Sequence, residues 1–226
     1  MSKQHAIKID ELYTYEPLTS NQRKAYDSWD DGDNICLTGS AGTGKTFIAM
    51  YLALENVLEK QSPQSKITII RSVVPTRDMG FLPGTKEEKQ EVFETPYKSI
   101  AVELLGGDQP YRRLVHNAQL EFMTTSYIRG MTIDNSVIII DEMQNLNFHE
   151  LDSVVTRIGE NCRIIMCGDY LQSDFKDGQE RDGIMKFMRI IESMKDFTIV
   201  NFGWEDIVRS DFVRDYIMTK EMLGIK

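Results

Sequence analysis

The segment Gly39-Ser40-Ala41-Gly42-Thr43-Gly44-Lys45-Thr46 constrains the fold of this chain more than any other. It follows residues 34–37, whose apolar side chains indicate a buried strand, and it leads into a helical pattern over residues 46–59. Glycines let backbone N–H groups turn toward a phosphate, and the start of a helix adds a partial positive charge. An ordinary glycine turn would not need the final Lys-Thr pair. The segment therefore predicts a phosphate-binding loop of the Walker A type.

The Walker A pattern predicts the roles of individual residues in this loop. We expect Lys45 to reach the β- and γ-phosphates of a nucleotide and to assist catalysis, and we expect the Thr46 hydroxyl to ligate Mg²⁺. The predicted ligands of the implied ATP include the eight residues of the loop, namely Gly39, Ser40, Ala41, Gly42, Thr43, Gly44, Lys45 and Thr46. Of these, only Thr46 is also a predicted ligand of Mg²⁺.

A second motif supplies carboxylates at the end of another strand. Residues 137–140 are Val-Ile-Ile-Ile and are followed at once by Asp141 and Glu142. The carboxyl end of a central strand is where α/β sheets hold ligands. We expect Asp141 to hold magnesium through water and Glu142 to act as the general base on the attacking water. Two solvated acids at a strand end are the alternative interpretation.

Two glutamines refine the prediction. Gln172 ends the segment Gly168-Asp169-Tyr170-Leu171-Gln172, which is similar to a γ-phosphate-sensing motif of superfamily 1 helicases; a polar turn is the alternative. Gln22 precedes the loop at a spacing typical of a glutamine that reads adenine. Thr19-x-x-Gln22 is also a capping box, so Gln22 has two interpretations.

The rest of the chain alternates between strand and helix patterns, which predicts an α/β fold with a doubly wound parallel sheet and helices on both faces. Residues 1–17 form a lead-in, and residues 18–226 form a single domain with an insertion at about 72–117. Expected strands cover 34–37, 66–71, 119–124, 136–140, 163–167 and 197–201. Expected helices cover 20–29, 46–59, 149–158, 184–194 and 205–223, with a further helix ending near residue 104.

Composition limits the classes of partner. A net charge of −9 argues against coating nucleic acid by bulk charge, so a nucleic-acid site would have to be a local patch. The candidates lie in or near the insertion and are Arg71, Arg77, Arg112, Arg113 and Arg129. The longest apolar runs fall far short of the roughly 20 residues that a membrane span needs. The polar N-terminal residues lack a secretory pattern, so we expect a cytoplasmic protein without a membrane partner.

The chain resembles the PhoH-like family of ATPases. The resemblance rests on Asn21-Gln22, the loop, Gly80-Phe81-Leu82-Pro83-Gly84, Arg129-Gly130, the box from Val137 to Asn145, Gly168–Gln172 and Asp206-Ile207-Val208-Arg209. It implies a P-loop NTPase with the RecA-like core of a superfamily 1 helicase motor domain. It also implies a homo-oligomer, with a hexameric ring favoured.

An arginine is needed to complete the predicted site, because phosphoryl transfer spreads charge over the γ-oxygens. Arg209 matches the C-terminal arginine of the family, and Arg214 lies five residues on. The charge would come from a C-terminal element or from a neighbouring subunit. We expect Arg209 to be catalytic, and in a head-to-tail ring it would enter the site of the next subunit. Ordinary surface pairing with nearby acids is the alternative.

Two functions of different classes follow. The first is an ATPase motor core that acts on RNA or single-stranded DNA, and the second is an ATP-dependent switch for a protein partner. A metabolite kinase is a weaker third alternative, because it gives no task to the Asp-Glu-x-Gln-Asn and Gly-Asp-x-x-Gln boxes.

Overall fold

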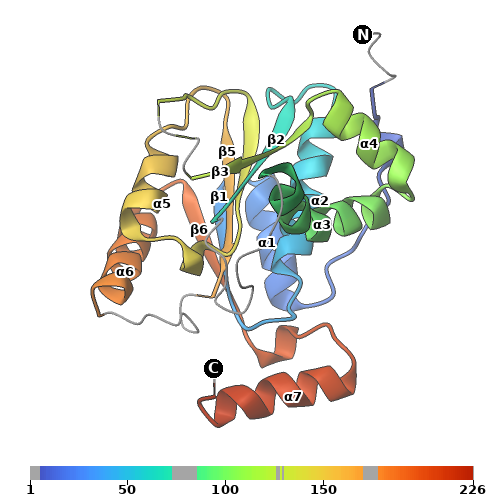
Figure 1. Cartoon of the computed structure of the whole chain (residues 1–226). Coiled ribbons are helices and arrows are strands. Elements are labelled where there is room, and N and C mark those ends of the chain that lie inside the picture. The colour runs from blue at the N-terminus through green and yellow to red at the C-terminus, as the bar shows by residue number, and fades with distance from the viewer. Residues whose placement is uncertain (1–5, 73–85, 126–127, 129, 170–177, 226) are drawn as a thin grey trace.

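The computed structural model describes residues 6–72, 86–125, 128, 130–169 and 178–225. In these residues six parallel strands form one sheet in the order β3-β2-β4-β5-β1-β6 (Figure 1). The strands are β1 (Asn34–Gly39), β2 (Lys66–Arg71), β3 (Leu120–Thr124), β4 (Ser136–Ile140), β5 (Arg163–Gly168) and β6 (Phe197–Phe202). The doubly wound parallel sheet expected from the sequence is confirmed. The strand order was not predicted.

Helices cover both faces of this sheet (Figure 1). One face carries α1 (Ser20–Asp30), α2 (Lys45–Leu58), α3 (Lys86–Leu104) and α4 (Asp108–His116), and the other carries α5 (Phe148–Val155) and α6 (Gly178–Ser193). The helix α7 (Asp211–Met222) stands apart from both layers. Short 3-10 helices lie at η1 (Ile9–Glu11), η2 (Met143–Asn145) and η3 (Trp204–Asp206). No helix in the described ranges combines the length and the apolar character that crossing a bilayer requires.

The central strands bury side chains on both faces. Val137 and Ile139 of β4 point into the core under α2, whereas Ile138 and Ile140 point into the core under α5 and α6. Alternate residues of a strand face opposite sides, so a strand covered on both sides must be apolar throughout. This explains the continuous apolar run that identified β4 in the sequence.

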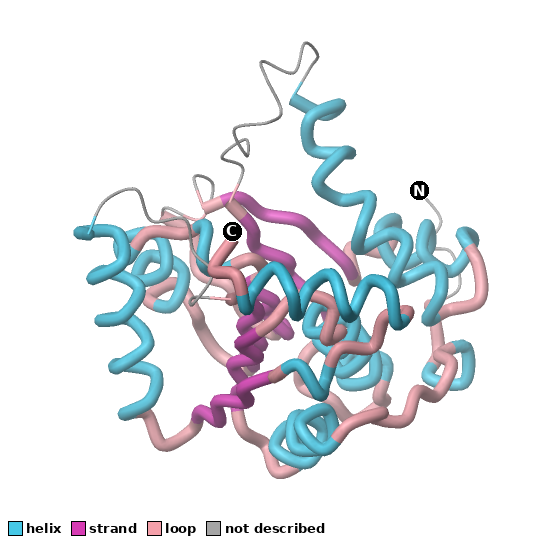
Figure 2. Tube along the Cα trace, turned by 90° about the horizontal axis from the view of Figure 1, so that it is seen from below, coloured by secondary structure: helices cyan, strands magenta, loops and turns pink. Residues whose placement is uncertain are grey.

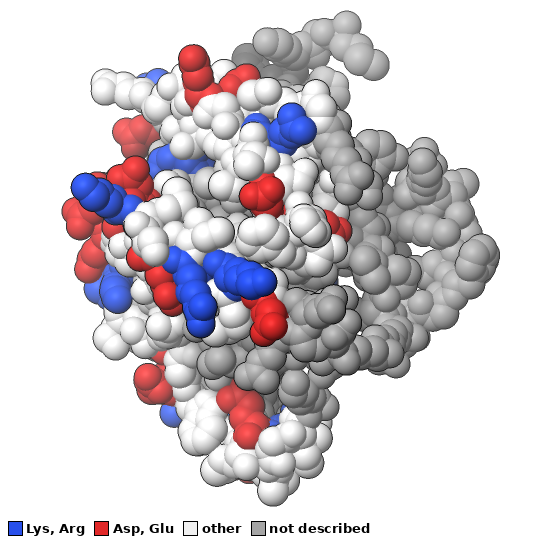
Figure 3. All heavy atoms as spheres, turned by 90° about the vertical axis from the view of Figure 1, so that its left-hand side faces the viewer, with Lys and Arg blue, Asp and Glu red and all other residues white. Residues whose placement is uncertain are grey.

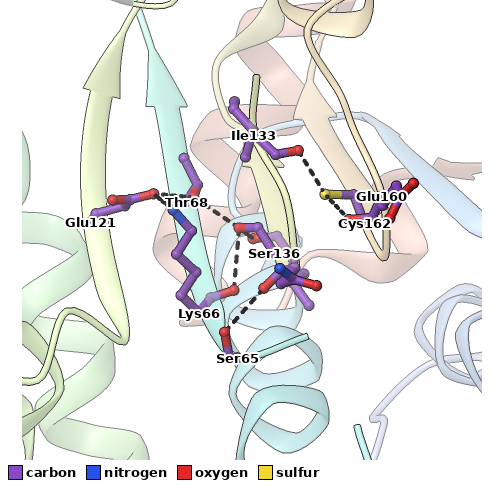
Figure 4. Close-up of polar contacts among 10 residues, drawn as sticks. Ser65, Lys66, Thr68, Glu121, Ile133, Ser136, Glu160 and Cys162 are labelled. Atoms are coloured by element: carbon purple, nitrogen blue, oxygen red, sulfur yellow. Dashed lines mark hydrogen bonds and ion pairs between the residues drawn. The ribbon is translucent and has the colours of Figure 1, made fainter. Parts of the chain in front are cut away.

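Polar side chains cross three of these strands in one ordered cluster (Figure 4). Thr68 on β2 donates a hydrogen bond to Glu121 on β3 at 2.7 Å and shares one with Ser136 on β4 at 2.8 Å. Lys66 pairs with the same Glu121 oxygen at 2.6 Å. Buried polar groups need such partners, so the cluster stabilises the pairing of β3, β2 and β4.

The lead-in and the predicted insertion both pack onto the sheet. Ile7 is buried, and the Tyr15 ring packs edge-on against Phe47 of α2 with centroids 5.0 Å apart. In the insertion, α3 and α4 bury Tyr97, Ala101, Leu104 and Leu114 in the same core as α2. The described parts of these segments therefore belong to the packed unit, although the sequence indicated that residues 72–117 leave it.

The C-terminal region corrects one prediction, because residues 205–223 do not form a single helix. The chain makes η3, becomes extended at Ile207 and restarts as α7 at Asp211. The cause is the fully buried Asp206 carboxylate, which accepts hydrogen bonds from Thr19, Asn21 and the Gly203 N–H. Seen from below, α7 lies across the edge of the sheet (Figure 2).

We predict that Asp206→Ala lowers the free energy of unfolding by about 3 kcal/mol, because three partly buried donors lose their acceptor. Equilibrium urea denaturation measures this change. The matched control is Asp215→Ala, which removes an exposed carboxylate from α7 and should change stability by less than about 0.5 kcal/mol. Equal effects of the two substitutions would contradict the structural role of Asp206.

Candidate nucleotide site

At three positions of the loop between β1 and α2, the backbone has a conformation that only glycine adopts easily. Gly39, Gly42 and Gly44 have φ angles of 117°, 75° and 85°. A Cβ atom on Gly39 would lie 2.0 Å from the backbone oxygen of Phe202, so β6 closes against the start of the loop. These positions explain the glycines of the motif.

Lys45 places its charge inside this loop. Its Nζ atom donates hydrogen bonds to the carbonyl oxygens of Gly39 and Ser40, each at 2.7 Å. Burial lowers the pKa of Lys45, while nearby Cys167, Asp169, Glu142 and Asp141 oppose that effect. The ammonium group is thus held within the loop, and its contact with nucleotide phosphates stays a prediction.

A cleft of about 760 Å³ opens beside the loop. This volume lies within the range of small-molecule sites in proteins. Its polar wall comes from the loop and from the ends of β4 and β5, and its apolar wall comes from the lead-in, α1 and α2. The lining includes Tyr15, Leu18, Gln22, Tyr26, Lys45, Thr46, Phe47, Asp141, Glu142, Gln144, Asp169 and Arg209.

The two predicted magnesium residues meet in this cleft, although Thr46 lies at the start of α2 and Asp141 follows the end of β4. The Thr46 hydroxyl lies 3.2 Å from each carboxylate oxygen of Asp141, across the intervening strand β5. Burial raises the pKa of Asp141, while a hydrogen bond from Tyr97 and the charge of Arg71 oppose the rise. A hydroxyl and a carboxylate are oxygen ligands of the kind that Mg²⁺ takes, so the residues fit this ion.

Glu142 follows in a strained backbone conformation, with φ 52° and ψ 43°. A non-glycine residue in this region is uncommon and is often found at functional sites. The Gln144 amide donates to the Glu142 carboxylate at 2.5 Å, and its carbonyl oxygen accepts from the Asp169 N–H at 3.1 Å. A Cβ atom on Gly168 would approach that carbonyl oxygen to 2.6 Å. Gln144 therefore links Glu142 to the end of β5, and Gly168 leaves the space for it.

The structure shows how Gln22 is held. Its backbone N–H donates to the Thr19 hydroxyl, as a cap requires, but its side chain does not return to the Thr19 backbone. Instead, the carbonyl oxygen accepts from the Leu18 N–H at 2.8 Å and the amide donates to the Thr43 carbonyl at 3.1 Å. The capping box is thus half formed, and Gln22 ties α1 to the loop. An adenine contact stays a prediction.

The C-terminal segment covers the same loop. The Val208 N–H donates to the Gly42 carbonyl at 3.1 Å, and the Ser40 hydroxyl donates to Glu221 of α7, also at 3.1 Å. The Cγ atom of Arg209 lies 3.1 Å from the position that a Cβ atom on Gly42 would take. Arg209 therefore borders the cleft of its own chain. An approach to the site of a neighbouring subunit stays a prediction.

The predicted nucleic-acid arginines do not gather in one place. The prediction that the insertion brings its arginines near the nucleotide is wrong for Arg112 and Arg113. Both lie on α4, which leads into the amino end of β3 at the side of the sheet away from α7 (Figure 1). They pair there with Asp108 and Glu11. Spacing along the chain could not show which edge of the sheet they occupy.

The other predicted arginines and the second glutamine have different positions. Arg71 ends β2 at the carboxyl edge, near enough to Asp141 for its charge to affect the carboxylate. Arg77, Arg129 and Gln172 lie outside the described residues. On the side covered by α5 and α6, basic and acidic side chains alternate without a continuous basic surface among the described residues (Figure 3).

Two residues of the site were missed by the sequence analysis. Tyr97 of α3 donates a hydrogen bond to Asp141 at 2.7 Å, and no motif marks its position. Gln144 was part of a recognised box but received no role. Its place two residues after the predicted general base, Glu142, is the signal that could have identified it.

The parallel sheet, the glycine loop and the hydroxyl–carboxylate pair together define a P-loop NTPase fold with a RecA-like sheet. The family model described as "PhoH-like protein" matches residues 14–220. The chain belongs to the PhoH-like family.

Relatives of the chain agree with this family. It is 35% identical to Protein PhoH of Escherichia coli strain K12 over 178 residues, covering 78% of this chain and 49% of that protein. It is 29% identical to a PhoH-like protein of Mycobacterium leprae over 205 residues, covering 90% of this chain and 58% of that protein. The chain thus spans about half the length of these relatives.

Solved structures share the fold at low sequence identity. The large terminase of a thermophilic bacteriophage has a TM-score of 0.55 at 11% identity, covering 92% of this chain and 50% of that one. The DUF1998 helicase MrfA bound to DNA has a TM-score of 0.50 at 11% identity, covering 82% of this chain and 27% of that one.

Proposed function

We propose that this chain binds ATP with Mg²⁺ and hydrolyses it to ADP and phosphate. One observation carries the proposal: the Thr46 hydroxyl and the Asp141 carboxylate meet within 3.2 Å in a cleft that also holds Lys45 and Glu142. Phosphate-binding groups, magnesium ligands and a general base are the parts that nucleotide hydrolysis needs.

Each of these residues has a distinct role in the proposed reaction. Loop N–H groups and Lys45 bind the phosphates, and Thr46 and Asp141 would hold Mg²⁺. The ion, when bound, neutralises charge on the phosphate oxygens. The water oxygen bonds to the γ-phosphorus as the bond to the bridging oxygen breaks, and that oxygen leaves with ADP. Glu142 accepts the proton from the water, with its carboxylate oriented by Gln144. Gln172 stays a predicted contact to the γ-phosphate.

We further propose that Arg209 acts on the nucleotide of its own chain. Its position beside Gly42 supports this role, because the side chain borders the cleft and needs no partner subunit to reach it. The hexameric ring stays a prediction, and the role proposed here for Arg209 does not depend on it. Arg209 is exposed, so it is free to turn toward the γ-phosphate without leaving a packed core.

We propose that RNA or single-stranded DNA couples to this hydrolysis. The fold shared with a DNA-bound helicase supports the idea, as does the position of Arg71 near Asp141 at the carboxyl edge. The alternative is a nucleotide-dependent switch for a protein partner. It is favoured by α7, which contacts the loop and exposes Phe212, Tyr216 and Met222.

We expect Glu142→Gln to bind nucleotide normally and to lose turnover by at least about 100-fold, the lower range for removing a general base. Lys45→Ala should lose productive binding, because it removes the cation that faces the phosphates. Phosphate release and binding of a fluorescent ATP analogue are the measurements. The matched control is Glu192→Gln on α6, which should be as active as wild type. Wild-type turnover in Glu142→Gln would exclude it as the base.

The second test concerns which site Arg209 serves. Arg209→Ala should lower turnover strongly, since such an arginine commonly contributes about 10³–10⁵ in rate. Mixing Arg209→Ala with Lys45→Ala subunits should restore nothing if the arginine serves its own chain. Arg214→Ala, an exposed change on α7, is the control. Recovery of activity in the mixture would instead place Arg209 in a neighbouring site.

The third test separates the two partner classes. Single-stranded RNA or DNA 20-mers should raise ATP turnover at low salt, and the increase should fall as salt rises, because phosphate contacts release counterions. Nucleic acid should stimulate Arg112→Ala as much as wild type. Arg112 lies on α4, at the end of the sheet opposite to α7 and the nucleotide cleft. Unchanged turnover at every salt concentration would reject the nucleic-acid coupling and favour the protein switch.

A further inference from the structure

The Asp141 carboxylate accepts a hydrogen bond from a second hydroxyl group, which lies outside the recognised motifs. The Tyr97 hydroxyl donates to Oδ2 of Asp141 at 2.7 Å, which is shorter than the two 3.2 Å contacts from Thr46. Tyr97 lies on α3, in the segment that the sequence indicated to be an insertion. Its exposed fraction is 1% and that of Asp141 is 4%, so the contact is shielded from water.

The surroundings of Tyr97 fix the position of its hydroxyl. The ring packs against Phe122 of β3 with centroids 5.6 Å apart, and it belongs to the same buried cluster as Ala101 and Leu104. A tightly packed aromatic ring has little freedom to move, and a buried phenol needs a hydrogen-bond partner. Phenylalanine would fill this space equally well. The hydroxyl is therefore explained by its acceptor, and that acceptor is Asp141.

The two donors together restrict the rotation of the carboxylate. Thr46 lies equally far from both oxygens, so its contacts alone leave the carboxylate plane free to tilt. Tyr97 holds one oxygen from the side of α3, while the Asp141 N–H is fixed by the Ile70 carbonyl at 3.1 Å. Groups that orient a metal ligand in this way commonly affect metal affinity or activity by about 10–100-fold.

We propose that Tyr97 is a positioning residue of the magnesium site, which holds the Asp141 carboxylate in the orientation that the ion requires. This inference rests on the proposed function, in which Asp141 serves Mg²⁺. It makes α3 part of the nucleotide site, because a shift of that helix would move the Tyr97 hydroxyl and release Asp141.

The test is a magnesium titration of nucleotide binding by the full chain, read with a fluorescent nonhydrolysable ATP analogue. Tyr97→Phe should raise the half-saturating Mg²⁺ concentration by about 10-fold. Affinity for the analogue without Mg²⁺ and the thermal unfolding midpoint should stay close to wild type. Tyr111→Phe removes a hydroxyl from another buried tyrosine, on α4, and should leave the titration unchanged.

A double-mutant cycle shows whether Tyr97 acts through Asp141. Asp141→Asn should itself raise the Mg²⁺ requirement, and adding Tyr97→Phe should then raise it little further, because interacting residues are not additive. Equal Mg²⁺ requirements in wild type and Tyr97→Phe would overturn the inference, as would the same rise in both backgrounds. A wild-type chain whose nucleotide binding ignores Mg²⁺ would instead reject the proposed function.

Discussion

Burying both faces of a parallel sheet determines where polar chemistry can occur in this protein. Side chains along β1, β4 and β5 pack under helices on each side, so charged groups within the strands would lose their hydration. The polar residues of the nucleotide site therefore lie beyond the carboxyl ends of the strands. Since all strands run in the same direction, those ends lie at one edge. Lys45, Thr46, Asp141 and Glu142 meet there despite their separation in the sequence.

Much of this arrangement could be predicted from sequence, because its signals are local. The glycine loop has a fixed spacing, and the run before Asp141 is apolar at every position, as a strand buried on both faces must be. Side chains that meet only through packing leave no such pattern. Tyr97 is one aromatic residue within a helix, and its hydrogen bond to Asp141 depends on how α3 crosses the sheet. Arg112 shows the opposite case. Its position in the sequence suggested the edge of the sheet near the nucleotide, but α4 places it near the amino end of β3.

The C-terminal segment was predicted as a helix with an important arginine, but its main contact was not foreseen. The buried Asp206 carboxylate joins η3 to Thr19 and Asn21 at the start of α1. Beyond it, Val208 and Glu221 bond to the loop. Both segments thus contact the phosphate loop, Gln22 through the Thr43 carbonyl and Val208 through the Gly42 carbonyl. Motifs that looked independent in the sequence, around Asn21 and around Arg209, are parts of one connected structure.

The contact between the C-terminal segment and the phosphate loop involves a tryptophan, Trp204, whose fluorescence depends on its surroundings. The Trp204 indole N–H donates to Glu221, and the same carboxylate oxygen accepts from Ser40 of the loop. We expect a ligand that draws Ser40 away from this oxygen to change the polarity around Trp204 and hence its emission. The chain has two tryptophans. The other, Trp29, lies beneath the Arg163 guanidinium at 3.3 Å, at the start of β5, far from the loop. We therefore expect a change in emission on ligand binding to arise from Trp204 rather than from Trp29.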